Sequence, residues 1–195
     1  MTALATFERD ILLWIHGHLR FAALTPVMRF LSLLGDMGLF WIALTVILLL
    51  FRKTRRLGIF CAASIILTFL VVNCAVKPLV ARVRPYDQFP EIQILAHAEH
   101  DFSFPSGHSA NSFAVAWILF RMTKKQYGVP AVILAALIAF SRLYVGVHYP
   151  TDVLAGIAIA IALAEVTLHG LPRIEKAQRR RARRNKRKKK AARAK

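Results

Sequence analysis

The feature that most constrains this 195-residue chain is its series of long apolar runs separated by short charged clusters. The clearest run, residues 37–51, carries no charged side chain and ends directly against Arg52 and Lys53. Hydrophobic residues make up 56% of the chain, above the roughly 45–50% of an ordinary soluble domain. Long runs without strand-like alternation indicate helices in lipid, because backbone within a bilayer must satisfy its own hydrogen bonds. The sequence therefore predicts an all-α, polytopic transmembrane helical bundle.

About six stretches are candidate membrane spans. The first is short and is interrupted by Pro26 and Arg29, and several others fall below the roughly 20 residues that cross a bilayer core. If the first stretch is only interfacial, five spans remain. The expected spans are residues 21–34, 37–51, 57–80, 106–122, 129–145 and 151–169.

The two ends of the chain differ in composition from this membrane domain, which is expected at residues 21–172. Residues 1–20 place charged side chains around a short apolar stretch, which predicts an interfacial amphipathic helix rather than a signal peptide. Residues 173–195 hold 14 Lys or Arg and one acid, and so supply most of the net charge of +18. We expect a disordered basic tail near anionic membrane lipids, with no specific nucleic-acid partner, although contact with a ribosome, a nucleic acid or a protein remains an alternative.

The positions of the basic residues also predict an orientation. Basic clusters at residues 52–56 and 121–125 share a side with the tail, which the positive-inside rule assigns to the cytoplasm. The connections at residues 77–104 and 142–150 then lie on the extracytoplasmic side. We expect a multi-pass protein of a bacterial-type plasma (inner) membrane.

Residues 104–109 (FPSGHS) begin the fourth expected span. Pro105 and Ser106 are typical of a helix start, whose free N–H groups attract anions, and Gly107 allows a phosphate to approach the backbone. His108 would lie beside such an oxyanion, as a general acid for a leaving alkoxide. A helix cap followed by an incidental histidine explains the same residues, so this motif alone decides nothing.

Residues 141–152 (SRLYVGVHYPTD) carry a more specific pattern. Asp152 lies four residues after His148, so its carboxylate can fold back, fix the imidazole tautomer and leave the other ring nitrogen free to attack. The planar guanidinium of Arg142 is suited to pairing two phosphate oxygens. A snorkelling arginine followed by a helix cap is the alternative interpretation.

Residues 77–85 (KPLVARVRP) add positive charge at the end of the third span. Lys77 lies in an apolar run, where an ammonium group requires an anionic partner. Arg84 begins the next loop, and Pro85 ends the helix. The spacing of Arg82 indicates no particular role, and we interpret it as an interfacial anchor.

Together these motifs resemble the three-part signature of the type 2 phosphatidic acid phosphatase family, which shares its active site with vanadium haloperoxidases. The resemblance covers residues 77–152 and has no departure at a signature position. It implies that His148 attacks phosphorus to form a phosphohistidine, that His108 protonates the leaving oxygen and that Asp152 orients His148. It implies no metal ion or other cofactor. The residues that it implies for binding the phosphoryl oxygens are Lys77, Arg84, Ser106, Gly107 and Arg142.

His97 and His100 form an H-x-x-H pair, but their loop has no helical pattern. A metal site requires its ligands to converge, so we interpret these two histidines as exposed polar residues.

The expected function is that of an integral membrane lipid phosphatase acting on a phosphomonoester or diphosphate headgroup. Undecaprenyl diphosphate is favoured, and phosphatidylglycerol phosphate and phosphatidic acid are alternatives. The segment from 87 to 103 is too short for a lid domain, so a few loop residues would select the headgroup. A lipid phosphotransferase that uses the same histidine, or a non-catalytic lipid-binding scaffold, would also fit the sequence. The loop residues in question are Tyr86, Asp87, Phe89 and Glu91.

Overall fold

The computed structural model describes residues 3–193, with side chains for residues 3–173 and for Lys176. Regular structure in this part of the chain is helical, which confirms the all-α prediction. A 3-10 turn at Asp36–Gly38 and a π-helical segment at Leu70–Val76 join neighbouring helices. The helices are α1 (Ala3–Leu19), α2 (Leu24–Leu34), α3 (Leu39–Leu50), α4 (Arg55–Phe69), α5 (Lys77–Val80), α6 (Pro85–Gln88), α7 (Gly107–Met122), α8 (Lys125–Tyr144) and α9 (Pro150–Arg193).

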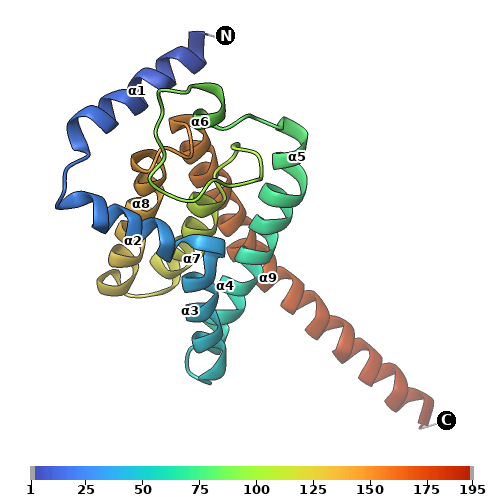
Figure 1. Ribbon diagram of the computed structural model, residues 1–195. Helices are drawn as coiled ribbons and strands as arrows, with labels where there is room; N and C mark the ends of the chain where they lie inside the picture. The colour runs from blue at the N-terminus through green and yellow to red at the C-terminus, as the bar shows by residue number, and fades with distance from the viewer. Residues whose placement is uncertain (1–2, 194–195) are drawn as a thin grey trace.

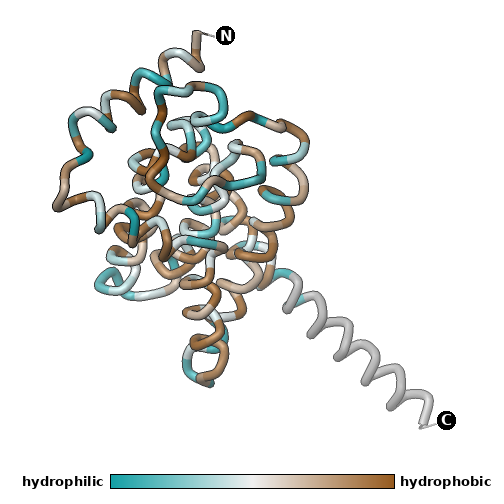
Figure 2. The backbone as a smooth tube through the Cα atoms, in the orientation of Figure 1, coloured by the Kyte–Doolittle hydropathy of each residue, from teal (hydrophilic) through white to brown (hydrophobic). Residues whose placement is uncertain are grey.

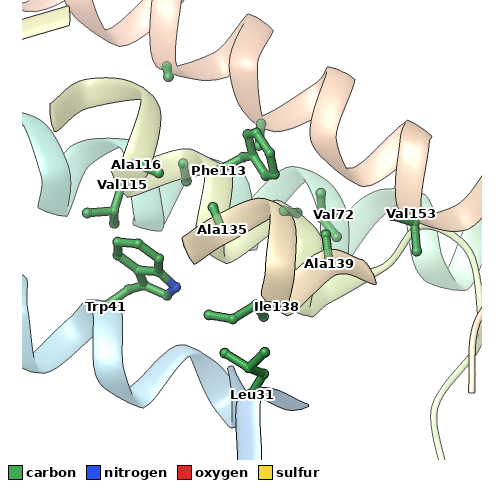
Figure 3. Packing of buried hydrophobic residues seen from close by; sticks show 14 of the residues in the cluster. Leu31, Trp41, Val72, Phe113, Val115, Ala116, Ala135, Ile138, Ala139 and Val153 are labelled. Atoms are coloured by element: carbon green, nitrogen blue, oxygen red, sulfur yellow. The ribbon is translucent and has the colours of Figure 1, made fainter. Parts of the chain in front are cut away.

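Helix α7 lies inside the bundle, with α4, α8 and α9 packed against it (Figure 1). Its buried side chains are mostly small, which lets neighbouring helices approach closely. Figure 3 shows Trp41 of α3 beside Val115 of α7, and Ile138 of α8 beside Leu31 of α2. The indole nitrogen of Trp41 donates a hydrogen bond to Ser112 Oγ at 2.9 Å, so the polar end of this large residue is also satisfied. The fully buried hydrophobic residues of α7 are Ala110, Ala114, Val115, Ala116 and Ile118.

Three helical segments are long and apolar enough to cross a membrane: Arg55–Gln88, Lys125–Tyr144 and Pro150–Arg173. A fourth is possible only if α2 and α3, which are bent by 48°, count together as one broken span. Because α7 has 16 residues, it falls short of this length. The chain is thus an integral membrane protein with three or four candidate spans in its described part, fewer than the six expected.

The first two expected spans, residues 21–34 and 37–51, are the two halves of this bent element. Met37 and Gly38 both have positive φ angles, of 48° and 69°, which ends one helix and starts the next in a new direction. Gly35 lies at the same bend, where an added Cβ would be 2.6 Å from Ile138 Cγ2 and 3.0 Å from His108 Cδ2. The bend therefore brings the end of α2 against the start of α7.

The three sequence motifs gather at one end of the bundle. This end holds α6, the long loop between α6 and α7, and the N-terminal helix α1 (Figure 1). The α3–α4 and α7–α8 turns lie at the other end, where α9 also leaves the bundle. Figure 2 shows hydrophilic backbone segments at the motif end and long hydrophobic stretches along α3 and α4. The motifs and the α3–α4 and α7–α8 turns thus lie at opposite ends of the bundle, as expected from connections that alternate between the two sides of a membrane. The side of the membrane that each end faces stays a prediction.

Helix α1 packs against α8 and α9 at the motif end. It buries Glu8, Leu12 and Ile15, and exposes Phe7 and Trp14. This two-faced pattern is what an interfacial helix requires. The expected location of residues 1–20 at the membrane surface remains a prediction.

The boundary expected at residue 173, and the disorder expected beyond it, concern a tail whose side chains lie outside the described part, apart from Lys176. Both expectations remain predictions.

One helix contact allows a sharp test. An added Cβ at Gly156 of α9 would lie 2.6 Å from the Ser106 carbonyl oxygen, closer than a real contact. We expect Gly156→Ala to lower the free energy of unfolding by about 1–3 kcal/mol, measured by thermal unfolding in detergent. Gly170→Ala is the control, because nothing lies within 4 Å of its added Cβ and alanine favours a helix. Equal effects of the two substitutions would contradict close packing of α9 on α7.

Candidate active site

Three buried cations from two of the motifs surround a single space. Lys77, Arg84 and Arg142 are exposed by only 6%, 1% and 2%. Asp101, from the α6–α7 loop, pairs with Lys77 Nζ and Arg84 Nη2. Glu99, from the same loop, pairs with Arg84 Nη2 and Arg142 Nη2. Because each acid bridges two of the three cations, the cations must all face the small volume that the two carboxylates occupy.

Main-chain and hydroxyl acceptors fix the two guanidinium groups. Arg84 donates from Nε to the Asp101 carbonyl oxygen at 2.8 Å and from Nη1 to the Val147 carbonyl oxygen at 2.9 Å. Arg142 donates from Nη1 to Ser32 Oγ of α2. These bonds leave Arg84 Nη2 and Arg142 Nη2 directed at the acids, which suits bidentate recognition of an oxyanion.

His148 and Asp152 lie together, fully buried, where the chain enters α9. Asp152 Oδ2 is 3.6 Å from His148 Nδ1, accepts from Ser103 Oγ at 2.5 Å and accepts from the Tyr149 N–H at 2.9 Å. The Ser103 hydroxyl also lies 3.4 Å from His148 Nδ1. The carboxylate is thus held close to Nδ1, at a distance longer than a good hydrogen bond, with the Ser103 hydroxyl beside both groups.

The start of α7 is built as the sequence predicts. Ser106 is the N-cap, and its Oγ accepts from the Ser109 N–H at 3.4 Å. The Ser106 N–H donates to the Asp152 carbonyl oxygen at 3.0 Å, which ties α7 to α9. A Cβ added to Gly107 would lie 3.9 Å from Lys77 Nζ, so the glycine leaves the backbone open beside that cation. His108 follows, with Nε2 3.9 Å from Asp36 Oδ1.

Several buried polar atoms here have no hydrogen-bond partner. Among the side chains that the structure describes, five buried nitrogen or oxygen atoms lack one, and three of the five belong to motif residues. These three are His108 Nε2, Arg142 Nε and His148 Nε2. Since buried polar groups are normally paired, such a concentration indicates a ligand site.

The charges around the site determine its protonation. Burial, together with the positive charges of Arg84 and Arg142, outweighs the opposing effect of Asp152 and lowers the pKa of His148 to about 4. Burial alone would raise the pKa of Glu99, but Arg142, His148 and Arg84 outweigh it and leave the pKa below its ordinary value. The pKa of Asp101 is lowered in the same way by Lys77 and Arg84 against burial. At neutral pH the site therefore holds a neutral His148 and two ionised acids.

A cavity of about 660 Å³ adjoins Arg142 and Glu99 and passes between α2 and the α6–α7 loop. Its volume is in the range of small-molecule sites. Charged and polar side chains line one part of it, and apolar side chains line the rest. The lining residues are Arg29, Phe30, Ser32, Leu33, Asp36, Ile94, Leu95, Ala96, His97, Glu99 and Arg142.

All eight residues that the sequence placed at the site lie in this region, although their chemical roles stay predictions. Sequence reasoning missed Glu8, Ser103, Glu99 and Asp101, which have no signature spacing. Arg82, interpreted as an interfacial anchor, instead donates to Asp152 Oδ1 at 2.6 Å.

The spacing of Arg82 in the sequence does not indicate its contact with Asp152. Residues 81–84 form an irregular connection that begins with a positive φ of 49° at Ala81, and Arg82 and Arg84 contact different carboxylates. His97 and His100 are both exposed, as expected, and His97 also lines the cavity. Within the described side chains, no group of three or more His, Cys, Asp or Glu is arranged to hold a metal ion.

The sequence of this chain is similar to those of known membrane phosphatases. The model of the PAP2 superfamily matches residues 56–176. An undecaprenyl-diphosphatase from Sulfolobus acidocaldarius is 36% identical over 135 residues, which cover 69% of this chain and 65% of that protein. This chain therefore belongs to the PAP2 superfamily, the family that the three motifs predict.

Two solved structures have the same fold. The crystal structure of a transmembrane PAP2-type phosphatidylglycerolphosphate phosphatase from Bacillus subtilis has a TM-score of 0.73 and 28% identity, and the match covers 89% of each chain. LpxE from Aquifex aeolicus has a TM-score of 0.72 and 28% identity, over 82% of this chain and 93% of that one.

The low pKa of His148 predicts how stability depends on pH. Between pH 6.5 and about 4 the unfolded chain binds a proton that buried His148 does not, so stability is lost as the pH falls through this window and is fully present above it. His148→Gln removes this contribution. We therefore expect the difference in Tm between wild type and His148→Gln to shift against the wild type as the pH is lowered from 7 to 4. A difference that is constant over this range would contradict a neutral, buried His148.

Proposed function

We propose that this protein is a membrane lipid phosphatase that transfers the terminal phosphoryl group of a lipid to His148 and then to water. The observation that carries the proposal is a neutral, buried histidine whose Nε2 has no partner, next to three buried cations. A nucleophile and a cationic cradle in one desolvated site are what phosphoryl transfer needs.

Substrate binding begins with an exchange of anions. The phosphoryl oxygens take the positions of the Glu99 and Asp101 carboxylates against Lys77, Arg84 and Arg142. Free N–H groups at the start of α7, beside Gly107, add hydrogen-bond donors without charge. In this role the cations stabilise the equatorial oxygens, a task that Mg²⁺ has in many other phosphotransfer enzymes, and no metal enters the proposed reaction.

The first chemical step forms a bond from His148 Nε2 to phosphorus and breaks the bond from phosphorus to the lipid-side oxygen. That oxygen takes a proton from His108, whose pKa burial and the nearby cations keep well below its ordinary value, so that His108 takes up this proton with the incoming phosphate anion. Asp152 stabilises the imidazole of His148, which has gained positive charge. In the second step water attacks phosphorus and gives a proton back to His108. The N–P bond breaks, and inorganic phosphate leaves.

For the substrate, we propose a polyprenyl diphosphate of the undecaprenyl type. Arg29 of α2 is exposed in the cavity that adjoins Arg142, and no partner for it is found among the described side chains. A phosphate between the reacting phosphoryl group and the lipid would lie on this route, while Phe30 and Leu33 offer apolar contact to a chain. The relative from Sulfolobus acidocaldarius is named for this diphosphate, whereas the Bacillus subtilis structure is named for phosphatidylglycerol phosphate.

For the orientation, we infer that the active site faces the extracytoplasmic side. The basic turns at residues 52–56 and 121–125 lie at the opposite end of the bundle, and so does the exit of α9 toward the basic tail. The positive-inside rule assigns such an end to the cytoplasm, where the tail would meet anionic lipids.

Two substitutions test the reaction. His148→Ala, in protein that is still inserted and folded, should reduce phosphate release to background. Arg142→Lys should lower kcat/KM by about 100-fold, because an ammonium group cannot make the bidentate contact that a guanidinium makes with two phosphate oxygens. Release of inorganic phosphate from a lipid substrate in detergent is the measurement. Substantial turnover by His148→Ala would reject the phosphohistidine, and loss of wild-type activity with a chelator would reject the metal-free reaction.

Arg29→Gln tests the substrate. With undecaprenyl diphosphate, we expect kcat/KM to fall about tenfold, the scale of one charge-assisted hydrogen bond, and with phosphatidic acid to change little. Lys53→Gln, on a turn at the other end of the bundle, is the matched control for loss of a positive charge. Equal loss on both lipids, or a wild-type preference for phosphatidylglycerol phosphate, would reject the diphosphate proposal without affecting the reaction at His148.

A further inference from the structure

A buried acid from the N-terminal helix reaches the catalytic region. Glu8 of α1 is 1% exposed, although it lies in a helix that is otherwise amphipathic. Its Oε1 accepts from the Thr151 N–H at 2.9 Å and from Thr151 Oγ1 at 2.6 Å. The Thr151 N–H is one of the donors that the start of α9 leaves free, so Glu8 caps a helix 143 residues further along the chain.

Arg82 links Glu8 to Asp152. Its Nη2 donates to Glu8 Oε2 at 2.5 Å, and its Nη1 donates to Asp152 Oδ1 at 2.6 Å and to Thr151 Oγ1 at 2.8 Å. The guanidinium lies over the Tyr149 ring, 3.8 Å from the centroid. The group is therefore fixed on one face by the ring and along its edge by two buried carboxylates.

Every contact of the Asp152 carboxylate is then assigned. Oδ1 is held by Arg82, and Oδ2 is held by Ser103 and the Tyr149 N–H beside His148 Nδ1. If Glu8 loses its charge, Arg82 retains a single carboxylate partner and can turn toward it or toward solvent. Because a buried ion pair depends strongly on geometry, the loss of one partner changes the position of the other.

We propose that Glu8 and Arg82 are positioning residues for Asp152 and His148, so that the N-terminal helix completes the catalytic site. Glu8 lies outside residues 56–176, the region that the family model matches. The inference rests on the proposed function, because it requires His148 to be the reacting group. It does not depend on which lipid is the substrate.

The test compares two charge removals on the same helix. Glu8→Gln keeps the size of the side chain but removes its charge, and Asp10→Asn does the same at an exposed site that pairs with the neighbouring Arg9. With the lipid that the wild type hydrolyses fastest, we expect Glu8→Gln to lower kcat about 10- to 100-fold with little change in KM. Asp10→Asn should match the wild type.

Thermal unfolding and gel filtration in detergent separate positioning from folding. The proposal requires a loss of kcat in Glu8→Gln protein that unfolds within a few degrees of the wild type. Arg82→Lys keeps a charge but cannot reach both carboxylates, so it should show a similar loss of kcat. The kcat of the double variant should be no lower than that of the less active single variant. If Glu8→Gln does not fold, Glu8→Asp decides, with the same expected change in kcat at constant KM.

Three results would overturn the inference: equal kcat for Glu8→Gln and Asp10→Asn, a change in KM alone, or wild-type kcat in Glu8→Asp where that variant decides. Failure of the proposed function is distinct from these results, since it would appear as a wild-type protein that releases no phosphate from any lipid.

Discussion

The site depends on one electrostatic constraint: three cations buried at the end of an apolar bundle require anions. Lys77, Arg84 and Arg142 could not stay charged in such an environment without partners, and Glu99 and Asp101 supply them. A phosphate that enters the site therefore replaces anions that are already there. The cost of removing the cations from water is met during folding, so substrate binding needs only to exchange one set of oxyanions for another. The arrangement also keeps the guanidinium groups in place before the substrate arrives.

The same constraint explains why parts of the site come from distant segments of the chain. Cations carried by one helix end would repel one another, whereas α5, the α6 entry and α8 bring them in from different directions and the α6–α7 loop brings the acids between them. The Ser106 N–H bond to the Asp152 carbonyl oxygen and the close packing at Gly156 hold the two histidine-bearing helix starts together. The backbone therefore fixes the spacing of the reacting groups, and the charges fix their protonation.

The sequence predicts that the motif residues gather at one site, because each motif combines polar residue types at a helix end, while their chemical roles stay predictions. It does not predict the partners of those residues. Nothing in the local pattern of Glu8 or Asp101 indicates that either meets an arginine, since both contacts arise only when helices pack. The bend between residues 21–34 and 37–51 is also not predicted, because positive φ at Met37 and Gly38 joins two expected crossings into one bent element and hydropathy does not report backbone angles. Arg82 belongs with Glu8 and Asp101, because its contacts with Glu8 and Asp152 arise only when α1 and α9 pack against the segment at residues 81–84.

Charge balance connects the site to its substrate. Three cations face two carboxylates, so the cluster holds one more positive than negative charge before Arg29 is counted. A phosphomonoester, with about −1.5 to −2 charges near neutral pH, would replace the carboxylates at nearly equal charge. A diphosphate headgroup carries more negative charge and extends toward the cavity where Arg29 lies. It would therefore offset more of the positive charge at the cluster and on Arg29 than a phosphomonoester does. The resting carboxylates leave some positive charge unbalanced, and a diphosphate gains more electrostatic binding free energy from it than a monoester does. This difference favours a diphosphate, even though both lipids present the same terminal phosphoryl group to His148.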